Sequence, residues 1–297
     1  MSLAPRAVLV HRTTEYEELV AHHGTHGQAA FFLSSRGRDI EEVAERHRRT
    51  RRALAEVTSA VPLAWRQARV ERADLDRFLF APEDVVVVVG QDGLVANVAK
   101  YLDGQPVIGI DTDPGRNPGV LVRHRPADAG TLLASTASSA ADELTMVEAV
   151  ADDTQRLVAL NEIYLGTAGH QTARYRLGLE NDGGVVEAQA SSGVLVGTGT
   201  GATGWLRSLW QERGARQALP SPTEDRLLWF VREAWPSPAT GTSLVAGELT
   251  ASAALTLTVE SDRLIAFGDG IETDALELTW GQTVRVGACA RRLRLVG

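Results

Sequence analysis

The sequence predicts a two-domain protein, with a layered α/β domain over residues 1–125 and a mainly β domain over residues 126–297. In the first part, short apolar runs alternate with charged stretches of helical spacing, as in strand–helix units packed in layers. In the second part, apolar runs return at short intervals between turn residues, which is typical of a sheet rich in hairpins. A chain of 297 residues is long enough for two domains of ordinary size.

The elements of the α/β domain follow from the spacing of apolar residues. Ala7 to Val10 is predicted to form the first strand, and Asp39 to Val57 a surface helix with apolar residues at helical spacing. Val85 to Val89 are five consecutive valines, apolar on both faces and β-branched, which predicts a buried parallel strand. Leu94 to Leu102 is expected to be a helix, and Val107 to Ile110 another short buried strand.

Two segments have the composition of linkers. Asp111 to Gly119 contains two prolines and two glycines, and Leu133 to Ala141 is rich in serine and other small residues. A domain boundary near residue 125 is therefore expected.

The β domain is predicted from strands separated by turns. The expected strands are Tyr175 to Glu180, Val185 to Ala190, Val194 to Gly197, Ala254 to Glu260 and Val284 to Val286. Two segments are expected to be helical, Ala202 to Arg213 and Glu224 to Val231. Asn181 to Gly184 is a predicted hairpin turn, and so is Gly268-Asp269-Gly270, since Asp-Gly often makes such turns.

Composition narrows the possible partners. The net charge of −8 argues against nucleic acid or an anionic membrane as a partner, because both need a clustered positive field. Cys289 is the single cysteine, which excludes a disulfide framework or a cysteine-based metal site and fits a reducing cytoplasm. No apolar run approaches the roughly 20 residues that span a bilayer, and the N-terminal residues lack the layout of a signal peptide. We therefore expect a soluble cytoplasmic protein.

The first segment whose residue types indicate a chemical function is the loop Gly90-Gln91-Asp92-Gly93, which links the valine strand to the next helix. Backbone N–H groups of such a loop, together with the helix N-terminus, form a site for phosphate. A carboxylate there would repel phosphate, so Asp92 is better explained as a general base or a magnesium-linked carboxylate. The alternative is a tight strand-to-helix turn with Asp92 as the N-cap.

The second segment is the pair Asn161-Glu162, embedded in the apolar run Ala159 to Gly166. Buried polar side chains need partners, and the hydroxyls of a bound ribose would satisfy both. The alternative is a strand end with both side chains solvated.

The third segment is the alternation of Gly and Thr from Gly197 to Gly204, after an apolar strand and before a helix. Each glycine would let a ligand approach the backbone, and the threonine hydroxyls, with free N–H groups, could hold phosphate or sugar oxygens. The alternative is a flexible glycine turn.

In this order and spacing, the three segments resemble the NAD kinase family, and most closely its mitochondrial-type branch. Counterparts in that branch extend over nearly the whole chain: Arg12 to Glu17, Glu45-Arg46-His47, Pro106 to Pro114, Ala159 to Glu162, Ser191-Ser192-Gly193 and Gly197 to Gly201. The resemblance implies an NAD kinase-like fold, with a Rossmann-like or phosphofructokinase-like first domain and a β-rich dinucleotide-binding domain whose last segment packs back on the first.

The implied activity is ATP- and Mg²⁺-dependent phosphorylation of the adenosine 2′-hydroxyl of NAD, giving NADP. Asp92 would be the general base, and Asn161 and Glu162 would contact the adenine end and the other ribose of NAD. No residue is assigned as the ligand of a resident metal. The remaining implied residues are Gly90, Gln91, Gly93, Thr198 and Gly199 for ATP phosphates, and Thr200, Thr203, Ser208 and Val120 for NAD. The family also implies a homodimer or homotetramer.

The sequence departs from the family pattern in the loop itself. Gln91 replaces a glycine, which would cost about 1–2 kcal/mol if the position required positive φ, and Leu94 replaces a threonine hydroxyl. Ser192 and the pair Val120-Leu121 also differ from most bacterial members. Two alternatives therefore stay open: a non-catalytic NAD(P) or nucleotide sensor, and a related kinase that acts on a lipid or sugar hydroxyl.

Overall fold

The computed structural model describes residues 4–116, 119–136, 140–152, 154–180 and 185–297. The chain divides into two compact units, Met1–Asp142 with Arg294–Gly297, and Glu143–Leu293. The predicted turn Asn181 to Gly184 lies outside the described residues, as do parts of both predicted linkers.

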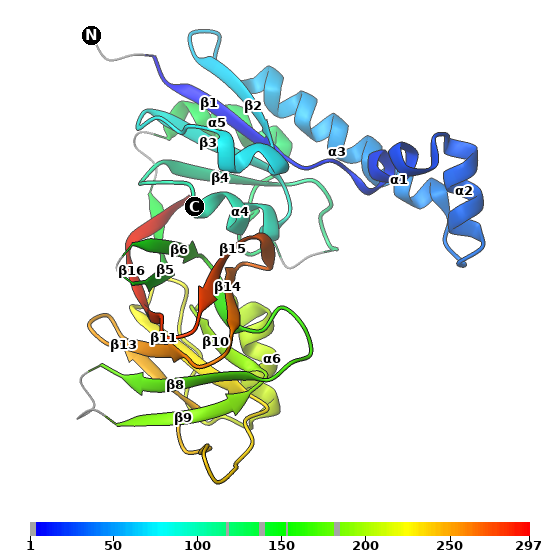
Figure 1. The fold of residues 1–297 in the computed structure, drawn as a ribbon. Coiled ribbons are helices and arrows are strands. Elements are labelled where there is room, and N and C mark those ends of the chain that lie inside the picture. The colour runs from blue at the N-terminus through cyan, green and yellow to red at the C-terminus, as the bar shows by residue number, and fades with distance from the viewer. Residues whose placement is uncertain (1–3, 117–118, 137–139, 153, 181–184) are drawn as a thin grey trace. The chain divides into compact units, whose positions relative to one another are not determined.

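The first unit contains a parallel sheet in the order β2-β1-β3-β4 (Figure 1). Its strands are β1 (Arg6–His11), β2 (Arg66–Glu71), β3 (Asp84–Gly90) and β4 (Pro106–Asp111). The end of β16 (Thr283–Val296) also belongs here, because Arg294 and Leu295 pair in parallel with Pro106 and Val107 of β4. The predicted valine strand is confirmed as β3, whose valines are buried throughout.

Helices cover this sheet and extend beyond it. They are α1 (Glu15–His23), α2 (His26–Ser34), α3 (Ile40–Ala60), α4 (Asp92–Ala99) and α5 (Ala129–Ser135), with 3-10 turns η1 (Arg72–Arg77) and η2 (Pro126–Asp128). Figure 1 shows α1 and α2 packed at one end of α3, in agreement with the contacts among these helices. Asp39 caps α3 by accepting a hydrogen bond from the Glu41 N–H at 2.9 Å, which confirms the predicted surface helix.

The first unit runs past the expected boundary near residue 125. Ala129 and Leu133 of α5 are buried in the same apolar cluster as Val57 of α3 and Val87 of β3. The segment that begins at Leu133 therefore starts in a packed helix, although its small residues suggested a linker.

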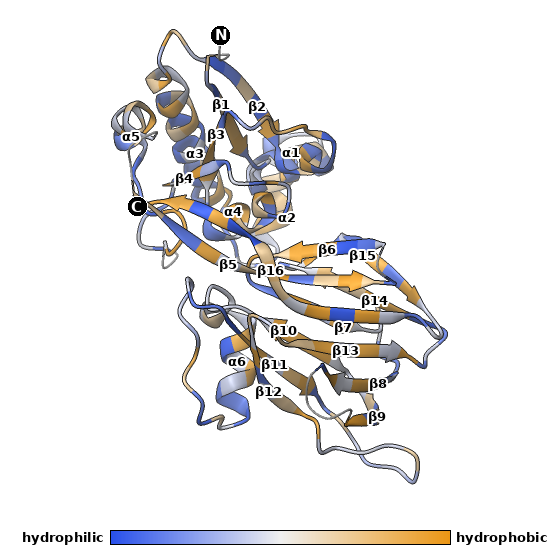
Figure 2. Ribbon diagram, turned by 90° about the vertical axis from the view of Figure 1, so that its left-hand side faces the viewer, coloured by the Kyte–Doolittle hydropathy of each residue, from blue (hydrophilic) through white to orange (hydrophobic). Residues whose placement is uncertain are grey.

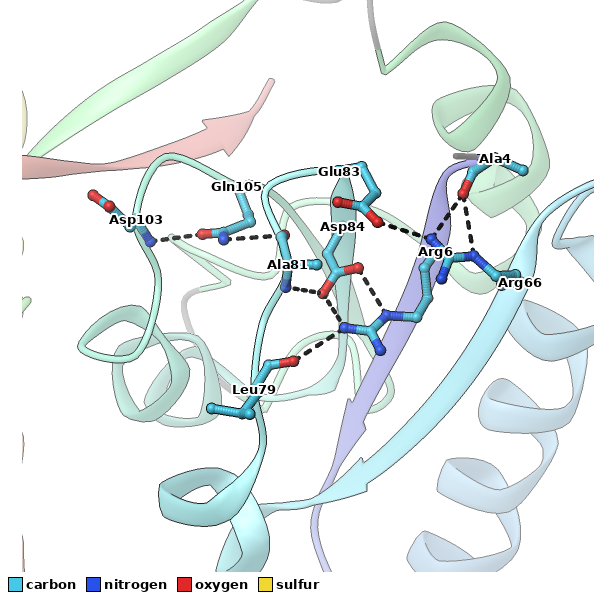
Figure 3. Close-up of polar contacts among 9 residues, drawn as sticks. All are labelled: Ala4, Arg6, Arg66, Leu79, Ala81, Glu83, Asp84, Asp103 and Gln105. Carbon is cyan, nitrogen blue, oxygen red and sulfur yellow. Dashed lines mark hydrogen bonds and ion pairs between the residues drawn. The ribbon is translucent and has the colours of Figure 1, made fainter. Parts of the chain in front are cut away.

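An ion pair fixes the beginning of β3 against β1 (Figure 3). Asp84 is 1% exposed, and Arg6 donates to both of its oxygens, from Nε at 2.8 Å and from Nη2 at 2.6 Å. The N–H of Ala81 adds a third bond at 2.7 Å. The ion pair and the hydrogen bonds compensate the buried charge of Asp84. Asp84 lies at the start of β3, whereas the predicted loop follows the end of that strand.

The second unit is built from antiparallel strands in two packed sheets. One sheet has the order β12-β11-β10-β7-β14-β15, and the other includes β16-β13-β8-β9 with β5 and β6. Their bounds are β5 (Ala141–Ala151), β6 (Gln155–Ala159), β7 (Glu162–Gly166), β8 (Ala173–Leu179), β9 (Val186–Ser191), β10 (Gly193–Gly197), β11 (Arg226–Arg232), β12 (Ala246–Thr250), β13 (Ala254–Val259), β14 (Arg263–Gly268) and β15 (Ile271–Thr279). One apolar cluster takes residues from both sheets, including Tyr175 and Trp229. The expectation of a mainly β second part is confirmed.

Helix α6 (Trp205–Glu212) covers the outer face of the six-stranded sheet. Leu206 and Leu209 of this helix pack with Leu195 of β10 and Phe230 of β11. In Figure 2, β11 is orange along much of its length, whereas α6 is mostly blue or pale. The predicted helix Ala202 to Arg213 is divided at Gly204 into the 3-10 turn η3 (Gly201–Thr203) and α6.

The prediction of a helix over Glu224 to Val231 is wrong, because this segment forms strand β11. Its apolar run is buried on both faces, with Leu227 and Val231 in the inter-sheet cluster and Leu228 and Phe230 under α6. Such a run lacks strand alternation, so its pattern does not distinguish a buried strand from a buried helix.

In the described part of the chain, no helix combines the length and apolar character needed to cross a membrane.

Candidate functional site

The loop after β3 is delivered by the buried valine strand to the start of α4. Gln91 is the N-cap of this helix, and its φ of −129° and ψ of 165° are those of extended backbone. The expected penalty for a side chain at this position is therefore absent, since positive φ is not required. Leu94 is buried, and its Cδ2 lies 3.1 Å from where a Cβ on Gly90 would be. Leu94 thus packs under the loop.

The Asp92 carboxylate accepts hydrogen bonds from three consecutive backbone N–H groups. Oδ1 accepts from Leu121 at 2.8 Å and from Val122 at 2.9 Å, and Oδ2 accepts from Val120 at 3.0 Å. Asp92 is the first residue of α4 and half-buried, so the alternative in which it acts as the N-cap is wrong. A carboxylate has about four acceptor sites, which leaves Oδ2 one site for a further donor.

A glycine in β4 allows the segment around residue 121 to reach Asp92. A Cβ on Gly109 would lie 2.1 Å from the carbonyl oxygen of Leu121, so a side chain does not fit there. His124 continues the contact, since its N–H donates to the Gly109 carbonyl at 3.1 Å and its carbonyl accepts from Asp111 at 2.8 Å. Sequence reasoning did not identify this role of Gly109. Val120, expected to contact NAD, contributes its N–H to Asp92.

In the second unit, Leu160 and Asn161 connect β6 to β7, and Glu162 is the first residue of β7. The segment from Leu160 to Glu162 is called the Asn161-Glu162 turn. Two neighbours hold the turn. The carboxylate of Asp269 accepts from the N–H groups of Leu160 and Asn161, at 2.9 and 2.6 Å. On the other side, Thr198 donates from its N–H to the Asn161 carbonyl at 2.8 Å and from Oγ1 to the Leu160 carbonyl at 2.6 Å.

The side chains of Asn161 and Glu162 form no hydrogen bond with any other residue that the structure describes, although their backbone is fixed. Burial, together with the negative charge of Asp269, raises the pKa of Glu162 to about 7. A carboxyl group with a raised pKa and free acceptor sites is a candidate for ligand binding.

The Gly/Thr segment lies directly against this turn. A Cβ on Gly201 would lie 2.4 Å from the Asn161 carbonyl oxygen and 3.0 Å from Oε2 of Glu162. A Cβ on Gly199 would lie 2.0 Å from the carbonyl oxygen of Ser221. Both glycines are thus needed for close packing within the protein.

The threonines and the serine of this segment differ in their surroundings. Thr198 is buried, and its hydroxyl also accepts from the N–H groups of Thr200 and Gly201, at 3.1 and 3.3 Å. The buried Thr200 hydroxyl has no hydrogen-bond partner in the described part of the chain. Thr203 and Ser208 are exposed, and their hydroxyls bond back to the carbonyls of Thr200 and Gly204.

The structure therefore gathers the predicted residues into two groups, one in each unit: Gly90 to Gly93 with Val120 in the first, and Asn161, Glu162 and Thr198 to Gly201 in the second. A cavity of about 380 Å³ in the second unit is lined by Leu209 and Glu212 of α6, by Arg213 directly after that helix, and by Arg232 at the end of β11, among others. None of the predicted residues lines it.

A scan against protein-family models gives no match for this chain. A search of curated proteins gives none either. The case for a function therefore depends on the residues and their geometry.

Proposed function

We propose that the protein is an NAD kinase, which transfers the γ-phosphoryl group of ATP to the adenosine 2′-hydroxyl of NAD. One observation carries the proposal: the side chains of Asn161 and Glu162 have no hydrogen-bond partner among the described residues, and they lie on a turn whose backbone is fixed on both sides. The arrangement of a parallel α/β unit and an antiparallel β unit agrees with the NAD kinase-like fold that the motifs suggest.

The second unit would bind the dinucleotide. A carboxylate accepts hydrogen bonds from both hydroxyls of a ribose, and an amide both donates to and accepts from a base. Glu162 and Asn161 supply these two groups on adjacent residues. The buried Thr200 hydroxyl, which has no hydrogen-bond partner among the described residues, is a further donor in the segment beside this pair.

The first unit would carry the chemistry. Oδ2 of Asp92 has one acceptor site left, which can orient the 2′-hydroxyl and take its proton. The 2′-oxygen then forms a bond to the γ-phosphorus, the bond from that phosphorus to the bridging oxygen breaks, and ADP leaves with the electron pair. The N–H groups at the start of α4 would stabilise phosphate charge.

Mg²⁺ would arrive with ATP. Among the described residues, no three His, Cys, Asp or Glu side chains are grouped so as to hold a metal ion. Mg²⁺ at nucleotide sites is held largely by phosphate oxygens and water, with one or two carboxylates. The proposal therefore takes the magnesium complex of ATP as the substrate.

A dinucleotide sensor is the second candidate, and the hydrogen bonds of Asp92 favour it. Three N–H donors give this carboxylate a structural task, the anchoring of residues 120–122, which would persist without catalysis. A kinase for a lipid or sugar hydroxyl could use the same loop, but the Asn161-Glu162 pair favours a dinucleotide.

The test is NADP formation by the whole protein with MgATP and other phosphoryl donors, with NAD and NADH as acceptors, alongside calorimetry with NAD. We expect NAD to bind and ATP-dependent NADP to accumulate. NAD binding without NADP formation from any donor would support the sensor and exclude the kinase. A parallel assay with lipid and sugar alcohols as acceptors tests the third alternative, which phosphorylation of one of them without NAD binding would favour.

A further inference from the structure

The hairpin between β14 and β15 turns at Asp269 and Gly270. Their φ values are +53° and +69°, as in the mirror-image turns that suit two-residue hairpins. The predicted hairpin turn at Gly268-Asp269-Gly270 is thus confirmed. Asn and Gly fit the first position of such a turn as well as Asp does. The turn therefore does not explain why a carboxylate is present.

The carboxylate is used outside its own hairpin. Both of its oxygens accept backbone N–H groups more than 100 positions away, those of Leu160 and Asn161. In return, the Asp269 N–H donates to the carbonyl of Glu162 at 3.1 Å. A Cβ on Gly268 would lie 2.7 Å from Cβ of Ala159, so the preceding glycine is needed for this approach. Three hydrogen bonds thus tie one hairpin to the turn that carries Asn161 and Glu162.

We propose that Asp269 is a positioning residue, which fixes the Asn161-Glu162 turn so that both side chains face a dinucleotide. This inference rests on the proposed function. Asp269 would not touch the ligand and would act through the two residues that do.

The negative charge of Asp269 gives the inference a signature beyond stability. Among the described residues, Asp269 is the charged group found to act on Glu162, and it raises the pKa of that carboxyl in addition to burial. Removal of this charge should make Glu162 ionise at lower pH. This ionisation midpoint is a readout at Glu162 itself, separate from the overall stability of the protein.

The experiment compares the whole wild-type protein with Asp269→Asn, which preserves the turn, one acceptor and the side-chain size. NAD affinity is measured by calorimetry across pH, and the ionisation of Glu162 by carbon NMR without ligand. In Asp269→Asn we expect about tenfold weaker NAD binding. We also expect the ionisation midpoint of Glu162 to move to lower pH, and the amide hydrogens of Leu160 and Asn161 to exchange faster.

Asp152→Asn is the matched control. Asp152 also has positive φ, +49°, and its carboxylate also holds a neighbouring turn, through Gln282 Nε2 at 2.6 Å and the Thr283 N–H at 3.1 Å. It precedes β6, whereas Asn161 follows that strand. We expect this variant to leave NAD affinity and the Glu162 midpoint unchanged.

The outcomes separate this inference from the proposed function. If Glu162→Gln weakens NAD binding but Asp269→Asn changes neither affinity nor midpoint, the proposed function stands and the positioning role is overturned. If the wild type does not bind NAD, the proposed function fails. The ligand-free midpoint and amide exchange then decide the positioning role, and an unchanged Asp269→Asn overturns it.

Discussion

Asp92 in the first unit and Glu162 in the second are both half-buried carboxylates beside a strand end, yet their surroundings are opposite. Three N–H groups orient Asp92, whereas no described residue donates to the Glu162 side chain. Hydrogen bonds fix the direction of a carboxylate, while burial without them disfavours its charge. Asp92 is therefore suited to act on one group in a set position, and Glu162 to gain its partners from a ligand.

The largest expected effect tests the Asp92 side of this comparison. Asp92→Asn should lower NADP formation at least about a hundredfold, because an amide cannot take the proton of the acceptor hydroxyl. Its oxygen can still accept from Leu121 and Val122, so NAD binding should stay close to that of the wild type. Steady-state kinetics and calorimetry measure both quantities, with exposed Asp76→Asn as control. Near-normal turnover would remove Asp92 from its proposed role.

The second prediction concerns stability on the Glu162 side. A carboxyl with its pKa raised from 4.5 to about 7 contributes stability that is present below about pH 4.5 and is lost as pH rises through 7. Between about pH 5 and pH 8, the free energy of unfolding of the wild type should fall relative to Glu162→Gln, on the order of 1–3 kcal/mol. Denaturant unfolding of both proteins at the two pH values measures this. Parallel pH dependence would mean that Glu162 ionises normally.

The third prediction concerns NAD affinity and pH. Ionised Glu162 can accept two ribose hydroxyls, so binding should strengthen as the carboxyl loses its proton. With a pKa of about 7, the ionised fraction rises about tenfold between roughly pH 6 and pH 8, and the NAD association constant should follow. Calorimetry across this range should show the rise in the wild type and a flat profile in Glu162→Gln. A rise that persists in the variant would assign the effect to another group.

The smallest expected effect returns to the loop of Asp92. Gln91 has extended backbone, so Gln91→Gly relieves no strain, and we expect activity within about twofold of the wild type. Gln91→Ala separates loss of the side chain from the added freedom of glycine. A clear rise in NADP formation for the glycine variant alone would show that the natural loop limits catalysis.

Elements whose structure is decided by local pattern were predicted correctly. The prediction for β11 was not. The valine strand β3 and the amphipathic helix α3 were both predicted, because the burial of apolar residues in them follows from the spacing of near neighbours. At β11, burial on both faces removed the alternation that marks a strand. The strand's neighbours in space decided its conformation.

At the candidate site, too, local sequence pattern indicated the residues but not their hydrogen-bond partners. The sequence indicated Asp92 from its place after an apolar run, and Asn161 and Glu162 from their place inside one. It did not indicate that Asp269 would hold the Asn161-Glu162 turn, since Asp-Gly has a sufficient explanation in its own hairpin. The only local signal was a carboxylate where asparagine would also serve.

The sequence by itself determined the order of elements around the loop: a buried valine strand, Asp92 at the start of a helix, and a polar pair inside an apolar run. Tertiary structure alone decided which groups meet these carboxyls. Residues 120–122 reach Asp92 because Gly109 has no side chain, and Asp269 reaches Glu162 because β14 pairs with β7 in the six-stranded sheet. These partners lie dozens of residues or more away along the chain, so their contacts depend on how whole elements pack.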